Sequence, residues 1–302
     1  MGTQEKRVKR AVSGWLVLDK PYDMTSTQAV GKVRWLFSAA KAGHAGTLDP
    51  LATGILPIAL GEATKAVPFV QDGRKIYRFD LAWGAATSTD DAEGAVTATS
   101  DRRPSEADVR AVLAQFTGQI EQVPPAFSAL KIGGERAYDL ARAGEAVELA
   151  ARTVSIQSLS LLAHGPQVST FEVTCGKGTY VRALARDLAE RLGTCGHVAK
   201  LHRAAVGDFT DTDAVRIEDL EAMDLAARDA ALKPVAAAFQ ALPEVRLRAD
   251  QAATIRNGNP VLLTGAGAPI ALEAAWASFA GEVVATGSVE RGQFKPKRVF
   301  NL

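Results

Sequence analysis

The stretch GHAGTLDPLATGILP, residues 43–57, sets a single carboxylate, Asp49, among glycines, prolines and small apolar residues, with His44 five positions before it. Glycine allows close backbone approach and unusual dihedral angles, and Pro50 stiffens the chain directly after the acid. An aspartate before a proline is also a common turn former. The stretch alone therefore leaves open whether Asp49 is a functional acid or a turn residue.

The bulk composition indicates a globular protein with a large core. The chain has 302 residues, of which 47% are hydrophobic and 23% are charged, which fits one large domain or a large and a small one. It has no apolar run long enough for a transmembrane helix and no signal-peptide pattern. Its two cysteines form no C-x-x-C pair. We therefore expect a reduced, cytoplasmic protein without a disulfide framework or a zinc site.

Charge is separated along the chain although the net charge is only +1. Basic residues gather in segments 6–34 and 291–298, and acidic residues gather in segment 211–229. This pattern predicts a basic face and an acidic back. On charge alone, however, an ordinary solvated surface is the favoured interpretation of this pattern.

Hydrophobic spacing predicts a mixture of helices and strands. Segment 75–83 alternates like a half-buried strand, with Tyr77 on its apolar side. Apolar residues recur at helical spacing after Ser26 or Thr27, one of which is the predicted N-cap. The same spacing recurs within 104–118. Segment 87–96 reads as a polar turn, and 169–193 as a strand, a tight glycine turn and a helix. After Pro243, short β-like pieces separated by glycine, asparagine and proline predict a small, mostly β second domain.

The stretch GKGTYVRALARDL, residues 176–188, places Tyr180 and Arg182 where that strand turns into the helix. It lacks a nucleotide-binding glycine fingerprint, and the chain shows no P-loop, no serine-nucleophile motif and no H-E-x-x-H. A carboxylate in a water-poor pocket is costly unless paired. We therefore predict that Arg182 pairs with Asp49 and keeps it ionised. His44 and Asp49 have no third ligand at suitable spacing, so no metal site is predicted.

The segment 124–149 breaks regular structure at Pro124 and Pro125 and turns at Gly133–Gly134. Basic residues and aromatic residues alternate through it. It reads as an inserted excursion that clamps a ligand. A plain surface hairpin and helix fits the same residues equally well.

Several stretches, taken in order, resemble the bacterial TruB family of tRNA pseudouridine-55 synthases. They are GWLVLDKPYDMTS, GHAGTLDPLATGILPIALGEATK, KIYRF, VPPAFSALKIGGERAYDLAR, GTYVRALARDL and HVAKLHRAAVGDF. The resemblance spans most of residues 14–210 and continues more weakly to the end. The block G-H-x-G-x-L-D-P-x-A-x-G is highly specific for this family.

The resemblance implies an α+β fold of the pseudouridine synthase type, with a mixed, mainly antiparallel central sheet flanked by helices. Residues 1–242 would form the catalytic domain, including the RNA-clamping insertion 124–149, and residues 243–302 a mostly β, PUA-like RNA-binding domain. The implied catalytic residues are Asp49, Tyr77 and Arg182; the implied substrate-binding residues are His44, Tyr180, Leu201 and Lys20. Without the resemblance, Tyr77 reads equally well as a core-facing strand aromatic.

The implied activity is the conversion of uridine-55 in the tRNA T-loop to pseudouridine, after extrusion of the nucleotide. This isomerisation needs no redox or phosphoryl chemistry, so no cofactor or metal is expected. The expected partner is the T-arm of tRNA; a monomer is expected, with no membrane and no obligate protein partner. One departure is Asp23, which stands where the family usually has glycine and puts the local loop geometry in question.

Two rival functions remain at this stage. The first is a related synthase that acts on ribosomal RNA within a guide-RNA particle, although such relatives usually have longer terminal extensions. The second is an RNA-binding module or folding chaperone that needs no catalysis. The presence of Asp49, Tyr77 and Arg182 argues against binding as the whole function.

Overall fold

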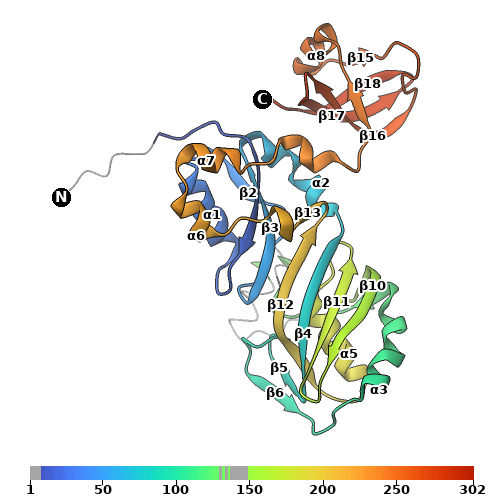
Figure 1. Ribbon diagram of the computed structural model, residues 1–302. Coiled ribbons are helices and arrows are strands. Elements are labelled where there is room, and N and C mark those ends of the chain that lie inside the picture. The colour runs from blue at the N-terminus through green and yellow to red at the C-terminus, as the bar shows by residue number, and fades with distance from the viewer. Residues whose placement is uncertain (1–7, 129–130, 133–134, 137–148) are drawn as a thin grey trace, which may run out of the picture.

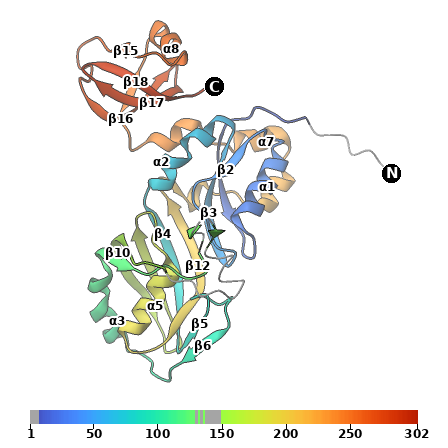
Figure 2. The same cartoon turned by 180° about the vertical axis from the view of Figure 1, so that it is seen from behind.

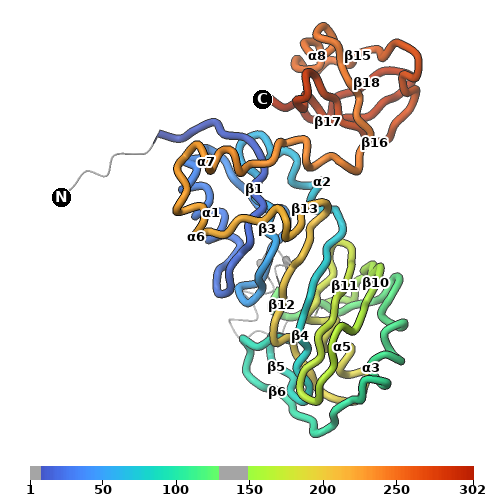
Figure 3. The backbone as a smooth tube through the Cα atoms, viewed as in Figure 1, coloured from blue at the N-terminus to red at the C-terminus, as the bar shows by residue number. Residues whose placement is uncertain are grey.

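The computed structural model describes residues 8–128, 131–132, 135–136 and 149–302. A nine-stranded sheet forms the body of the molecule, and a smaller sheet follows near the C-terminus (Figures 1 and 3). In spatial order the large sheet contains β1 (Gly14–Lys20), β3 (Ala52–Leu60), β12 (Gly196–Val206), β4 (Lys75–Trp83), β11 (Val168–Cys175), β10 (Arg152–His164) and β7 (Gly118–Gln122), with β2 (Ala42–His44) beside β3 and β13 (Phe209–Thr210) beside β12.

The large sheet is mixed but mainly antiparallel, which confirms the predicted fold class. Its one parallel ladder among the described strands joins β3 to β12, with Leu201 opposite Ala52. On its other side β12 pairs antiparallel with β4, which sets Arg203 opposite Tyr77. Strand β12 therefore lies between the start of β3, just after Asp49, and the middle of β4.

The alternation predicted for segment 75–83 is present in β4. Phe79, Leu81 and Trp83 are buried, whereas Arg78 is exposed. Tyr77 is only partly buried, so it is not a plain core residue. The alternation along β4 follows from the pleat, which sends successive side chains to opposite faces of the sheet.

Helices cover the large sheet and link its strands (Figures 1 and 2). Helix α5 follows the glycine turn after β11 and packs on β12 and β4. The α-helices of this part are α1 (Ser26–Leu36), α2 (Val67–Asp72), α3 (Glu106–Val112), α5 (Val181–Arg191), α6 (Ile217–Ala222) and α7 (Leu225–Ala230). Shorter elements are the 3₁₀ helices η1 (Gly61–Ala66), η2 (Leu113–Phe116), η3 (Asp211–Asp213) and η4 (Val235–Phe239), and the strands β5 (Ala85–Thr87) and β6 (Val96–Thr99).

The predicted N-cap of α1 was wrong by one or two residues. Thr25 caps the helix, because its hydroxyl accepts from the Gln28 amide while the Gln28 side chain accepts from the Thr25 amide. This reciprocal capping box satisfies two of the free amides of the first turn. Ser26 is buried and bonds elsewhere, to the backbone of Leu48.

The C-terminal segment is rich in β structure, as predicted. Its sheet runs β14 (Glu244–Arg246), β16 (Leu272–Phe279), β17 (Glu282–Glu290), β18 (Gln293–Val299) and β15 (Val261–Leu262), with α8 (Ala249–Arg256) packed against it. Four aromatic side chains join it to the body of the molecule. Phe239 packs at centroid distances of 5.1 Å from Phe69, 5.9 Å from Trp276 and 5.9 Å from Phe300.

Part of the predicted clamping insertion, 124–149, lies outside the described residues, namely 129–130, 133–134 and 137–148. Within it, β8 (Lys131–Ile132) and β9 (Glu135–Arg136) pair antiparallel. Its first residues, 124–128, are described. Within the described part of the chain, no helix is both long and apolar enough to span a bilayer.

Candidate active site

A cavity of about 260 Å³ opens where the loop before β3 meets β4, β12 and the start of α5. Five of the predicted site residues line it, and they come from four separate segments of the chain. They are Asp49, Tyr77, Tyr180, Arg182 and Leu201. The β12 register explains this convergence, because Leu201 lies opposite both Ala52 of β3 and Phe79 of β4.

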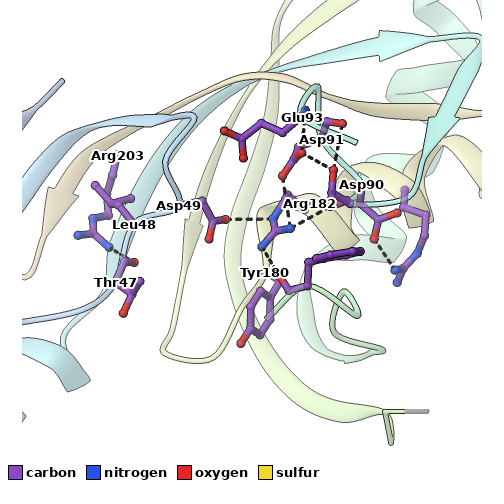
Figure 4. Close-up of polar contacts among 12 residues, drawn as sticks. Thr47, Leu48, Asp49, Asp90, Asp91, Glu93, Tyr180, Arg182 and Arg203 are labelled. Atoms are coloured by element: carbon purple, nitrogen blue, oxygen red, sulfur yellow. Dashed lines mark hydrogen bonds and ion pairs between the residues drawn. The ribbon is translucent and has the colours of Figure 1, made fainter. Parts of the chain in front are cut away.

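Asp49 and Arg182 are in direct contact in this cavity. Arg182 Nε lies 3.0 Å from Asp49 Oδ2 (Figure 4). The arginine side chain is only 5% exposed, whereas the aspartate side chain is 36% exposed. Nε has no aligned hydrogen bond, so the contact is an ion pair without hydrogen-bond geometry. The cation is therefore buried behind the carboxylate, which faces the opening.

Arg182 has a second acidic partner that the sequence did not identify. Its Nη1 lies 3.3 Å from Asp91 Oδ2, and Asp91 is 2% exposed. Figure 4 shows Arg182 between Asp49 and Asp91. Nη1 and Nη2 also donate to the carbonyls of Thr89 and Phe127, each at 2.9 Å. A buried guanidinium needs such partners to offset its desolvation, and together they fix its position.

The backbone around Asp49 is held on every side. The buried Arg203 donates to the carbonyls of Gly46 at 3.0 Å and Thr47 at 3.2 Å. The Ser26 hydroxyl donates to the Leu48 carbonyl and accepts from the Leu48 amide. Lys20 donates to the Pro50 carbonyl at 3.2 Å. These bonds hold the loop in place and leave the Asp49 side chain partly exposed.

Arg203 was missed as a site residue, although the stretch that contains it was quoted. It lines the cavity opposite Tyr77 and also donates to the Ile55 carbonyl at 2.7 Å. Burial raises the pKa of the Tyr77 phenol, and the nearby Arg203 guanidinium opposes that rise. Burial likewise raises the pKa of Tyr180. Both phenols therefore enter the site as neutral hydroxyls at pH 7.

Lys20 lies outside the cavity lining. It is fully buried, and its Nζ donates to the carbonyls of Pro21 at 2.8 Å, Met24 at 2.6 Å and Pro50 at 3.2 Å. Burial lowers the pKa of its ammonium group to about 8, and the charge of Asp49 opposes this. Lys20 therefore acts on the loop backbone and presents no group to the cavity.

His44 is the other predicted residue that does not line the cavity. It ends β2 and is partly buried, and its Nδ1 has no hydrogen-bond partner. Burial lowers the pKa of its imidazole, and Arg203 adds to that effect. The described residues contain no group of three or more histidine, cysteine, aspartate or glutamate side chains able to hold a metal ion.

Asp23, where the family resemblance implies glycine, occupies a conformation that suits glycine. Its φ is +59°, in the left-handed region that aspartate tolerates better than most residues. Its amide donates to the Pro50 carbonyl at 3.0 Å. The loop of Asp23 therefore contacts the segment after Asp49 through its backbone.

Gly54 lies close to Asp49 in the sequence, but the structure requires a glycine there for strand packing. Its φ is +97°, and an added Cβ would lie 2.4 Å from the Arg203 carbonyl oxygen. The glycine is needed for the close approach of β3 to β12. It thereby allows the pairing of β3 with β12 beside the cavity.

The chain is similar to known proteins both in sequence and in structure. A family model described as the N-terminal domain of TruB family pseudouridylate synthases matches residues 34–181, and a tRNA pseudouridylate synthase B C-terminal domain model matches 182–240. The chain is 56% identical to a tRNA pseudouridine synthase B of a Chelativorans species over the full length of both. It is 53% identical to proteins of the same name from Mesorhizobium japonicum and Rhizobium meliloti, each over 99% of both chains.

Solved structures show the same fold at low sequence identity. A chain from the crystal structure of a Cbf5–Nop10–Gar1 complex superposes with a TM-score of 0.72 at 24% identity, covering 96% of this chain and 83% of that one. A chain from an H/ACA ribonucleoprotein bound to a substrate RNA gives 0.72 at 21% identity, with 96% and 85% covered. The two family models and the full-length relatives together establish that this chain belongs to the TruB family of tRNA pseudouridine synthases, which are isomerases.

Proposed function

We propose that this protein converts uridine-55 in the T-loop of tRNA to pseudouridine, with Asp49 as the essential catalytic residue. The observation that carries the proposal is the placement of Asp49: its carboxylate is partly exposed at a small cavity, while a buried arginine pairs with it. The loop that carries it is fixed by Ser26, Lys20 and Arg203. Such preorganisation suits an acid that must meet one atom of a bound nucleotide.

The cavity suits an extruded base better than a stacked one. Its volume of about 260 Å³ is below the ~300–1,000 Å³ of sites for drug-sized ligands. Tyr77, Tyr180 and Leu201 give it two aromatic side chains and an apolar wall. Aromatic stacking contributes ~1–3 kcal/mol per base, which offsets the few kcal/mol needed to unstack the nucleotide. The target uridine accordingly leaves the RNA stack and enters beside Asp49.

The reaction balances without an outside reactant. The bond between the ribose C1′ and N1 of uracil breaks, the base rotates, and C1′ bonds to C5. C5 then loses its proton and N1 gains one. Asp49, as an ionised carboxylate, serves as nucleophile or base at the sugar–base junction. Tyr77 is a second candidate participant, since it lines the same cavity.

Binding of the T-arm involves the remaining parts of the chain. Residues 1–242 form the catalytic domain and residues 243–302 a PUA-like RNA-binding domain. Contacts from basic residues to phosphates supply affinity that falls with salt. The insertion 124–149 is the proposed clamp, and His44 fills the space that the base vacates.

The test uses the purified chain and an unmodified tRNA transcript. Chemical probing should detect pseudouridine at position 55, and a transcript with cytidine there should give no product. Asp49→Asn should abolish product while RNA binding persists. Asp219→Asn, a change at an exposed carboxylate on α6, is the matched control and should leave the rate unchanged. Tight binding without product from the unsubstituted chain would instead support the chaperone function.

A further inference from the structure

Helix α5 presents a second arginine one turn after Arg182. Arg186 Nη1 lies 2.8 Å from Asp90 Oδ2, and its Nη2 donates to the Val123 carbonyl at 2.8 Å. The two side chains of the ion pair are 22% and 15% exposed. Arg186 also contacts Asp187 of its own helix at 2.9 Å. Residues four apart lie on the same side of a helix, so both arginines face the same neighbours.

The two arginines hold the same pair of segments. Arg182 donates to the carbonyls of Thr89 and Phe127. Arg186 binds the adjacent Asp90 and the nearby Val123 carbonyl. Each guanidinium thus joins α5 to the turn 88–94 and to the segment 122–128. The second pair lies one helical turn farther from the cavity than the first.

The backbone at Asp90 shows why this turn needs support. Its φ is +60°, a left-handed conformation that costs a non-glycine residue about 1 kcal/mol or more. The Asp90 amide donates to the Thr87 carbonyl at 3.2 Å, and its carbonyl accepts from the Val198 amide at 3.0 Å. Asp91 follows directly, and its carboxylate pairs with Arg182. The Asp90 conformation therefore sets the direction from which Asp91 meets Arg182.

We propose that Asp90 and Arg186 are positioning residues for the pseudouridine synthase reaction. Their ion pair holds the left-handed turn that presents Asp91 and the Thr89 carbonyl to Arg182, and thereby fixes Arg182 against Asp49. This inference rests on the proposed role of Asp49. It assigns Asp90 and Arg186 no contact with RNA, so they act on the chemical step and leave affinity unchanged.

The experiment measures single-turnover pseudouridine formation and RNA dissociation constants separately. Asp90→Asn keeps the shape and the tolerance of positive φ but removes the charge, and Arg186→Met removes the other partner. Each should lower the single-turnover rate about tenfold, the scale expected when reacting groups shift by a fraction of an ångström. The double variant should lose no more than Arg186→Met alone, because the Asp90–Arg186 pair is already broken in that single variant. Dissociation constants should stay within twofold.

Controls separate positioning from loss of fold and from failure of the proposed function. Arg186→Lys keeps a charge opposite Asp90 and should recover most of the rate. Arg110→Met breaks an exposed pair with Glu106 on α3 and should change nothing. Rates within twofold of the natural chain, additive losses, or losses confined to affinity would overturn the inference. If the natural chain makes no pseudouridine-55, the proposed function fails first; if it does and the variants match it, only this inference fails.

Discussion

Lys20 makes the stability of this protein depend on pH in an unusual direction. Its ammonium is fully buried and meets three carbonyls, those of Pro21, Met24 and Pro50. Burial lowers its pKa from 10.5 to about 8. The folded state therefore releases this proton at a lower pH than the unfolded state does. Between about pH 8 and 10.5 the unfolded state binds more protons, so the free energy of unfolding rises with pH.

The size of the effect follows from the two pKa values. Each tenfold change in proton affinity is worth about 1.4 kcal/mol, so the full rise is roughly 3 kcal/mol. Between pH 7.5 and 10, where unfolding is practical to measure, roughly 2 kcal/mol of it should appear. Tyrosines and other lysines also titrate in this range. The contribution of Lys20 is therefore the difference between the natural chain and Lys20→Met at each pH.

Urea unfolding at a series of pH values measures that difference. The natural chain should gain roughly 2 kcal/mol over Lys20→Met between pH 7.5 and 10, whatever the offset at pH 7.5. Lys200→Met removes an ammonium whose side chain is 84% exposed and controls for the loss of one surface charge. A difference that stays constant, or falls, as pH rises would refute the assignment of a lowered pKa. Activity should decline above about pH 8, because a neutral amine has only two protons for three carbonyls.

Two further changes test the site and the junction between the two sheets. Arg182→Met leaves Asp49 and the buried Asp91 without their cation. We therefore expect a 10²–10³-fold lower single-turnover rate and a loss of about 3–5 kcal/mol in the free energy of unfolding. A rate within threefold of the natural chain would exclude the proposed pairing role. Phe239→Ala empties a fully buried position between Phe69, Trp276 and Phe300. It should lower the free energy of unfolding in urea by about 3–5 kcal/mol and expose the chain near Pro243 to limited proteolysis. An unchanged proteolysis pattern would show that the aromatic cluster does not hold the C-terminal sheet.

Local sequence pattern predicted the elements on which the site is built. Strand β4 and helix α5 were predictable because each buries one face, and burial imposes a period of two or of 3.6 on its apolar residues. The N-cap of α1 was misassigned by one or two positions because Thr25, Ser26 and Thr27 are all able to cap. Spacing cannot rank adjacent candidates of this kind, and the capping box between Thr25 and Gln28 settles the choice.

The residues missed by sequence reasoning are those whose role depends on contacts far apart in the chain. Arg203 bonds the carbonyl of Ile55, 148 positions earlier, only because β12 lies between β3 and β4. Asp91 reads as part of a polar turn, and nothing in its neighbours indicates that it is 2% exposed. Both positions become visible only when the strand register and the docking of α5 are known.

The charges around Asp49 explain why many buried contacts surround a partly exposed carboxylate. Arg203 and Lys20 bring positive charge close behind the loop, yet their hydrogen bonds go to carbonyls of its backbone. Arg182 contacts the Asp49 carboxylate directly but also binds Asp91. The cations therefore fix the geometry of the loop while leaving the outer face of Asp49 unoccupied. A flexible loop would have to lose that freedom at each turnover, whereas this one has lost it on folding.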